Sequence, residues 1–140
     1  MKPLAVALSA AWLSTLSPLT AAQQVGPGST FRDCPTCPEM VVLPAGEFTM
    51  GSPKEESGQV DEKPLRKVTF ANAFAMSKFE ITFDQWDACT AEGACPKADD
   101  EGAGRADRPA FNVSWGEAHG FATRLSNKTG KKYRMPTEAE

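Results

Sequence analysis

Four cysteines are the residues of this chain whose spacing could support chemistry. They form two close pairs, Cys34 with Cys37 and Cys89 with Cys95. In an oxidising compartment such pairs become disulfides, and four cysteines allow three pairings that the sequence alone cannot separate. We favour Cys34 with Cys37 and Cys89 with Cys95, because each bond closes a short loop that contains Pro or Gly. All four are therefore structural disulfide candidates.

Two other uses of the cysteines remain open. Four thiolates could hold a zinc ion, although export favours oxidation over thiolate ligation. The run Cys34-Pro-Thr-Cys37 also has the spacing of thioredoxin-like redox motifs, which need a helix directly after the motif. Pro38 and the strand-like run beyond it forbid an immediate helix. The redox interpretation is therefore the weaker one.

The other potential metal ligands make a poorer case. His119 is the only histidine, and no second ligand lies at helical spacing from it, so we expect a surface or hydrogen-bonded role. Asp99, Asp100 and Glu101 are clustered, but they lack the ligand spacing of a calcium loop, and a solvated turn is preferred. The sequence thus assigns no catalytic, cofactor-binding or metal-binding residue.

Export is predicted from the first 22 residues. Lys2 gives a short positive region, an apolar stretch follows from Leu4 to Leu16, and Thr20-Ala21-Ala22 offers small side chains to a signal peptidase. We expect cleavage after Ala22, with an uncleaved N-terminal anchor as the alternative. The mature protein would be periplasmic or secreted, without a membrane association, and residues 23–30 would form a linker.

Composition narrows the range of partners. The chain of 140 residues has a formal net charge of −3, and removal of residues 1–22 leaves 14 basic against 18 acidic residues, or −4. The basic residues are scattered among acids and form no stripe with aromatics, which argues against a nucleic-acid partner. With 11 Gly and 11 Pro, the sequence predicts a loop-rich α+β fold.

Short strands with intervening turns are predicted in the first half of the mature chain. Residues 40–43 and 47–50 should pair as a hairpin across Pro44-Ala45-Gly46. A charged surface loop is expected over residues 52–64. Even spacing of apolar residues predicts a strand over 67–76 with a bulge near Asn72, and a brief alternation over 79–81. Residues 131–135 also read as a strand.

Helices are predicted where capping boxes occur. Thr82 to Gln85 opens a short helix that ends at Gly93, and Ser114 to Glu117 opens a second one that closes at Gly130. A solvated loop should separate them over residues 99–109. The predicted apolar stripe of the second helix is Trp115, Ala118, Ala122 and Leu125. A third start signal, Thr137 to Glu140, leads us to interpret residues 31–140 as the N-terminal portion of a larger domain.

Four segments in order carry a resemblance to a known family. They are residues 40–52 (MVVLPAGEFTMGS), 80–82 (EIT), 112–115 (NVSW) and 133–140 (YRMPTEAE). Together they resemble the formylglycine-generating enzyme, or sulfatase-modifying factor, family, over residues 31–140. Met135 stands where the family usually has Leu. In these motifs we expect Trp115 to be a core aromatic and Arg134 to pair with a nearby acid.

The resemblance implies a C-type-lectin-like variant of the α+β class and an oxidoreductase activity. The family oxidises a substrate cysteine in a partner protein to formylglycine with molecular oxygen, and its chemistry depends on two cysteines that hold copper(I). Those cysteines and the structural calcium ligands lie after the segment that matches residues 136–140. Cys89 and Cys95 do not have the spacing of that catalytic pair. No catalytic residue is therefore transferred to this chain, and no activity is expected from it alone.

Two functions follow as hypotheses. In the first, the complete protein is an exported enzyme that acts on a cysteine-containing segment of a partner protein. In the second, it keeps the lectin-like scaffold without the thiol pair and binds protein or carbohydrate.

Overall fold

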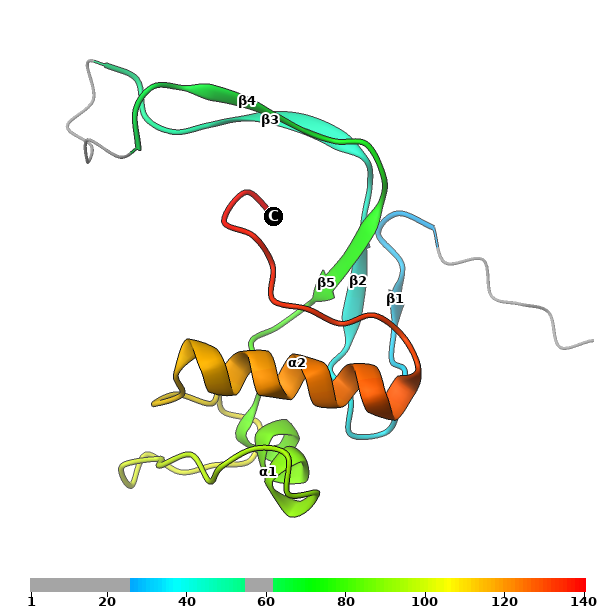
Figure 1. Cartoon of the computed structure of the whole chain (residues 1–140), viewed down its shortest axis with the longest axis vertical. Helices are drawn as coiled ribbons and strands as arrows, with labels where there is room; N and C mark the ends of the chain where they lie inside the picture. Colours follow the sequence, from blue (N-terminus) through cyan, green and yellow to red (C-terminus); the bar gives the residue numbers. More distant parts are fainter. Residues whose placement is uncertain (1–25, 55–61) are drawn as a thin grey trace, which may run out of the picture.

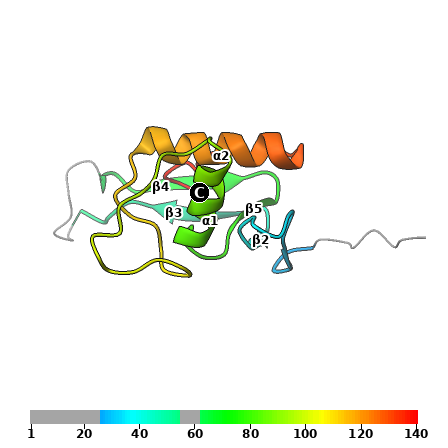
Figure 2. The ribbon, with the colours of Figure 1, turned by 90° about the horizontal axis from the view of Figure 1, so that it is seen from below.

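The computed structural model describes residues 26–54 and 62–140. The predicted signal peptide lies outside the described residues, as does the larger part of the predicted charged loop. The described residues form a mixed α+β unit in which a small sheet and a two-stranded ribbon precede two helices (Figure 1). This agrees with the predicted α+β class. Viewed from below, α2 lies along one side of the strands and α1 lies beneath them (Figure 2).

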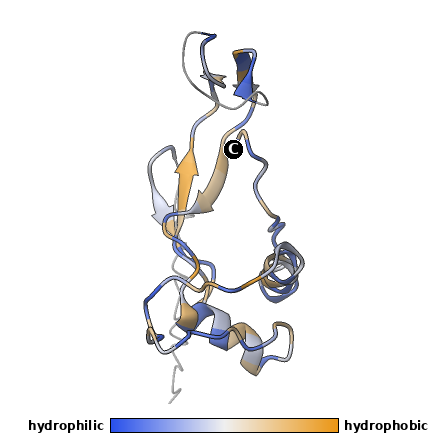
Figure 3. Ribbon diagram, turned by 90° about the vertical axis from the view of Figure 1, so that its left-hand side faces the viewer, coloured by the Kyte–Doolittle hydropathy of each residue, from blue (hydrophilic) through white to orange (hydrophobic). Residues whose placement is uncertain are grey.

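The central sheet has three antiparallel strands in the order β1-β2-β5. Their bounds are Thr30–Phe31, Met40–Leu43 and Phe74–Ser77. In the middle strand, Met40 and Val42 are buried, as expected of alternating side chains with one face toward the core. The apolar character of β2 stands out in Figure 3. Gly28 and Ser29 also exchange backbone hydrogen bonds with Val42, so the last residues of the predicted linker belong to the sheet.

The predicted hairpin between β2 and its successor is wrong. Strand β3, Gly46–Met50, pairs with β4, Arg66–Phe70, in a separate antiparallel ribbon. A strand has two edges, and both edges of β2 are already occupied by β1 and β5. Pattern and turn chemistry predicted β3 correctly as a strand but could not show which partner it takes.

One predicted strand is two strands in the structure. The expected strand over residues 67–76 breaks at 71–73, where the predicted bulge lay, and its halves β4 and β5 belong to different sheets. The expected strands over 79–81 and 131–135 are not strands. In the first, Ile81 O accepts a hydrogen bond from Ala110 N, and an isolated bridge from Thr82 to Pro109 follows directly after it.

Both capped helices are present. Helix α1, Phe83–Ala91, and helix α2, Trp115–Thr129, each begin with the predicted capping box, at Thr82 and Ser114. Gly130 ends α2 in the left-handed conformation, with φ 69°, which glycine adopts without a steric penalty. The loop predicted over residues 99–109 has no helix or strand.

The core lies where the two helices meet. Trp86 of α1 stacks on Phe121 of α2, with ring centroids 5.6 Å apart. Trp86 also donates its indole N–H to Pro96 O at 2.8 Å, so that its one polar atom is satisfied. Phe83, Cys89 and Leu125 belong to the same buried cluster. This cluster fixes α2 against α1 and so positions the helix beside the sheet.

Candidate functional site

A groove of about 660 Å³ lies between the central sheet, α2 and the segment after α2. Its floor is apolar and is formed by side chains from the sheet, from α2 and from the stretch between β5 and α1: Met40, Met76, Ile81, Phe121 and Leu125. Residues 131–136 return from the end of α2 across the sheet and form one wall (Figure 1). The groove is therefore assembled from segments that lie far apart in the sequence.

Helix α2 presents its apolar face to this groove because of its capping and periodicity. Ala118, Phe121, Ala122 and Leu125 recur at intervals of three and four residues and line the cavity. The capping box at Ser114 satisfies otherwise free amides at the start of the helix. Hydrogen bonds from Ser114 hold the pKa of Glu117 below its usual range. The helix thus begins at a defined residue, which sets the face that meets the sheet.

A largely buried acid joins the two sides of the groove. Asp33, just after β1, accepts hydrogen bonds from Tyr133 Oη and from Lys131 Nζ, the latter at 2.5 Å. Burial alone would raise the pKa of Asp33, but the bonds from Lys131 and Tyr133 outweigh it and lower the pKa. Burial and the bond to Asp33 raise the pKa of Tyr133. The lowered pKa of Asp33 favours its ionised form, and the raised pKa of Tyr133 favours its neutral form.

The far end of the wall carries a second ion pair, which lies within the segment after α2. Arg134 donates to both carboxylate oxygens of Glu140, as expected from the sequence for an acid near Arg134. Thr137 and Glu140 form the predicted capping box: Thr137 N donates to Glu140 Oε2 at 2.8 Å, and Glu140 N to Thr137 Oγ1 at 3.3 Å. The bonds from Arg134, followed by those from Thr137, lower the pKa of Glu140 to about 2.

The polar groups at the rim are thus largely paired with one another. Two more contacts fasten the wall to α2, because Ser126 Oγ accepts from Tyr133 N at 2.9 Å and donates to Tyr133 O at 3.1 Å. The wall needs no β-ladder, which explains why residues 131–135 are extended without being a strand. What the groove offers to a ligand is chiefly apolar surface.

The cysteines form disulfides outside this groove. Cys34 is joined to Cys37 and Cys89 to Cys95, with Cα atoms 4.9 and 5.3 Å apart. This is the favoured one of the three pairings. It is incompatible with a zinc site built from all four thiolates.

The ions that the family resemblance implies do not fit these residues. Copper(I) needs thiolate ligands, and every cysteine of the chain is in a disulfide. Across residues 26–54 and 62–140, no group of three or more His, Cys, Asp or Glu side chains is arranged to hold a metal. The disulfides thus leave no free thiolate for copper(I) among these four cysteines.

The other residues considered from the sequence lie apart from the groove. His119 stacks on Trp115, with ring centroids 5.3 Å apart. Asp99 accepts a hydrogen bond from Glu101 N at 2.9 Å, and Glu101 accepts one from Asn112 Nδ2 at 2.8 Å. The acids thus stabilise an exposed turn.

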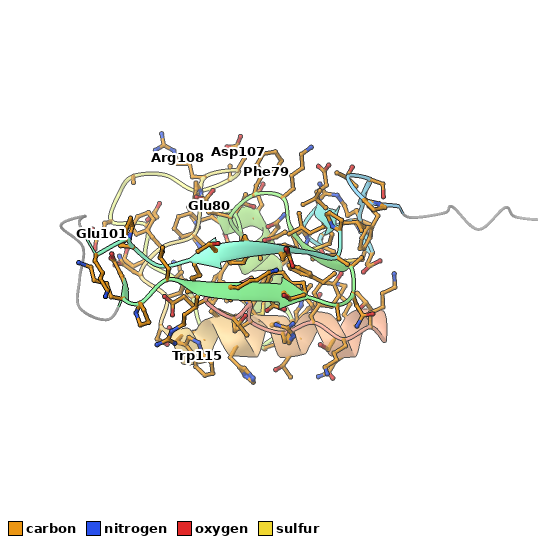
Figure 4. The ribbon with its side chains drawn as sticks, turned by 90° about the horizontal axis from the view of Figure 1, so that it is seen from above. Phe79, Glu80, Glu101, Asp107, Arg108 and Trp115 are labelled. Carbon is orange, nitrogen blue, oxygen red and sulfur yellow. A yellow bond between two sulfur atoms is a disulfide. The ribbon has the colours of Figure 1, made fainter. Side chains whose placement is uncertain are left out.

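Sequence reasoning missed three residues of the site and misplaced a fourth. Trp115 is not a core aromatic, because it is 69% exposed and lies on the outer side of α2 (Figure 4). Phe121 is the buried aromatic of that helix, and its spacing of three from Ala118 and four from Leu125 was the available signal. Asp33 and Tyr133 are 100 positions apart and carried no local signal of their contact.

Fold and groove together define a mixed α+β domain with a small sheet, a β-ribbon and two helices. Residues 27–140 match the family described as the sulfatase-modifying factor enzyme 1-like domain. The chain therefore belongs to the sulfatase-modifying factor family, which confirms the resemblance found in the sequence.

Among solved structures, the chain is similar to that of PvdO from Pseudomonas aeruginosa, with 44% sequence identity and a TM-score of 0.71. The match covers 81% of this chain and 49% of the PvdO chain, so the chain spans about half the length of that relative. No curated protein matches the chain significantly.

Two further findings concern the compartment. Within residues 26–54 and 62–140, no helix combines the length and the apolar character needed to cross a membrane. The two disulfides are typical of proteins that fold in an oxidising compartment outside the cytoplasm.

Proposed function

We propose that this chain forms the structural portion of an exported enzyme of the formylglycine-generating type. In the complete protein, the domain would oxidise a cysteine in an extended segment of a partner protein. The family match over residues 27–140 is the observation that carries the proposal. The likeness to a solved structure at 44% identity supports the same scaffold, and we propose the C-type-lectin-like variant of it for the whole domain.

In this proposal the groove is covered by further polypeptide of the same domain. Its lining is mainly apolar, and its charged rim groups are paired internally, so a small polar ligand would find few free partners. Apolar surface rimmed by polar residues is typical of interfaces. The matched region accounts for 49% of the PvdO chain, which leaves polypeptide in that relative to occupy such a surface.

The described residues have a scaffolding role in the proposed enzyme. They provide no ligand for copper, and their cysteines hold loops in place. Their part is to position the groove walls through the Trp86–Phe121 stack and the bonds of Asp33. The metal and the reacting thiols would come from other parts of the complete protein.

A periplasmic or secreted location is part of the same proposal. The disulfides and the signal-peptide features of residues 1–22 both support export. The partner would then be an exported protein as well, one that presents its cysteine before it has folded.

The proposed activity is tested with the protein expressed from its complete gene. The purified protein is incubated with copper, oxygen and a peptide that contains one cysteine, and aldehyde is captured with a hydrazide and located by mass spectrometry. We expect an aldehyde at the cysteine and none in a matched peptide with serine there. Failure to form aldehyde with a folded, copper-supplied protein would refute the enzyme proposal. Retained binding of the peptide, or of a glycan, would then favour the non-catalytic lectin-like module.

The covered groove is tested separately with the 140-residue chain alone. We expect no aldehyde from it, poor solubility, and strong binding of a dye that reports exposed apolar surface. A soluble monomer that melts in one cooperative transition would contradict the idea that other polypeptide covers the groove.

A further inference from the structure

The loop between β1 and β2 is closed on itself by the first disulfide. Cys37 is fully buried in the core, whereas Cys34 is half-buried beside the exposed Pro35 and Thr36. Cys37 N donates to Cys34 O at 3.0 Å, and Arg32 Nη1 donates to Cys37 O at 2.6 Å. Residues 32–37 therefore form a compact loop in which Cys34 is the more exposed of the two cysteines.

The same loop holds the wall of the groove. Asp33 lies next to Cys34, and its side chain is 8% exposed while it binds Lys131 and Tyr133. Thr36 Oγ1 accepts a hydrogen bond from Lys128 Nζ at 3.4 Å. Three side chains from the end of α2 and the segment after it thus converge on this disulfide loop.

Residues 131–136 depend on these side-chain contacts for their position. The segment has neither helix nor strand, so no backbone ladder fixes it. Its other fastening near α2 is the pair of bonds between Ser126 Oγ and the backbone of Tyr133. Loss of the Asp33 contacts would leave the wall attached to α2 chiefly through the two bonds of Ser126.

We propose that the Cys34–Cys37 disulfide is a redox-sensitive latch that keeps Asp33 in place and the groove wall closed. Reduction by a dithiol would begin with attack of one thiolate on the sulfur of Cys34, the more exposed of the two cysteines, which releases Cys37 as a thiolate that takes up a proton. The second thiol of the reductant then displaces Cys34. The protein gains two thiols, and the reductant leaves as a disulfide.

The Cys89–Cys95 disulfide is an internal control, against which the ease of reduction of Cys34–Cys37 is compared. Cys89 is fully buried and Cys95 is 7% exposed, so neither sulfur offers a reductant comparable access. Opening the loop at Cys34 restores conformational freedom to Asp33, whose neighbours Lys131 and Tyr133 then lose a fixed acceptor. The latch does not depend on what the groove binds.

The test combines graded reduction with hydrogen exchange on the full-length exported protein. Increasing dithiothreitol, followed by alkylation and mass spectrometry, should label Cys34 and Cys37 before Cys89 and Cys95. At that stage, exchange of the amides of residues 131–135, and above all of the hydrogen-bonded amide of Tyr133, should become faster by roughly tenfold or more, the change expected for loss of hydrogen bonds to a charged group. Amides of α1 should keep their rates. Loss of protection in α1 as well, or no change in residues 131–136, would overturn the latch.

Variants test whether the Cys34–Cys37 disulfide acts on the groove wall through Asp33. Asp33→Asn in the oxidised protein should speed exchange in residues 131–136 to the level of reduced wild type, and reduction should then add little. Asp107→Asn, an exposed acid in the loop before α2, is the matched control and should leave that segment unchanged. A large further effect of reduction in Asp33→Asn would show that the disulfide does not act through Asp33.

Discussion

Arg124 of α2 donates its Nε and Nη2 atoms to the two carboxylate oxygens of Glu92, at 2.6 Å each, and so joins the two helices. Glu92 is the C-cap residue of α1, and Arg124 is almost fully buried beside it. Lys128 donates to the same carboxylate at 2.5 Å. The end of one helix is thereby fixed to the middle of the next through a paired geometry that a lysine at position 124 could not reproduce.

Replacement of Arg124 should therefore destabilise the domain. Arg124→Ala removes two charge-assisted hydrogen bonds and a buried aliphatic stem, and we expect a loss of about 1–3 kcal/mol in the free energy of unfolding. Chemical denaturation measures this change. Lys67→Ala is the control, because Lys67 pairs with Glu47 at 2.8 Å on the exposed ribbon and should cost under about 1 kcal/mol. Equal losses in the two variants would contradict the role given to Arg124.

Acid should weaken the same connection. The bonds from Arg124 and then Lys128 lower the pKa of Glu92 from its ordinary value of 4.5 to about 2. A carboxyl whose pKa is lower in the folded state stabilises the fold above its unfolded pKa and ceases to do so as it becomes protonated. Stability should thus fall between about pH 5 and pH 2. Denaturation curves across this range should show a shallower pH dependence for Glu92→Gln, and an unchanged slope would exclude the pair as a contributor.

Tyr133 offers a direct spectroscopic measurement, because it is the only tyrosine in the chain. Burial and the hydrogen bond to Asp33 raise its pKa above the ordinary value of 10.0. The absorbance of the phenolate should therefore appear at a higher pH in the folded protein than in the same protein in denaturant. Asp33→Asn should move the folded midpoint back toward the denatured one. A folded midpoint at the ordinary value would show that the contact is absent in solution.

Gly51 should resist substitution, whereas Gly46 should tolerate it. Gly51 has φ 107°, and a Cβ atom there would lie 2.4 Å from Glu62 O and 3.3 Å from Pro64 O. Gly51→Ala should cost more than about 1 kcal/mol, because both the backbone conformation and the contact are unfavourable. Gly46→Ala meets nothing within 4 Å and is the matched control in the same ribbon. Thermal melting of both variants tests the difference, and similar midpoints would contradict it.

Local features of the fold were predictable from the sequence, and long-range ones were not. Thr82 and Ser114 begin helices because a capping box is a contact between residues three positions apart. The partner of β3 could not be predicted in this way, because pairing with β2 or with β4 satisfies the same alternation of side chains. Only the occupation of both edges of β2 decides between them.

In the groove, too, local features were predictable from the sequence and long-range contacts were not. The apolar face of α2 follows from its helical period, although Phe121 rather than Trp115 supplies the buried aromatic. The contact of Asp33 with Tyr133 depends on how two irregular segments meet across the sheet, and neither segment has a periodic pattern. The family resemblance identified the scaffold as a whole, whereas individual side-chain contacts needed three-dimensional coordinates.

The register of the central sheet has a consequence for how this scaffold tolerates change. Leu43 at the end of β2 faces Phe74 at the start of β5, so the chain departs on the ribbon and returns to almost the same place. Figure 1 shows β3 and β4 extending away from the helices. The ribbon of β3 and β4 is therefore an insertion between the two neighbouring strands β2 and β5. Insertions and deletions at its tip should leave the sheet and the helices intact, and a tag or a foreign loop could be grafted there.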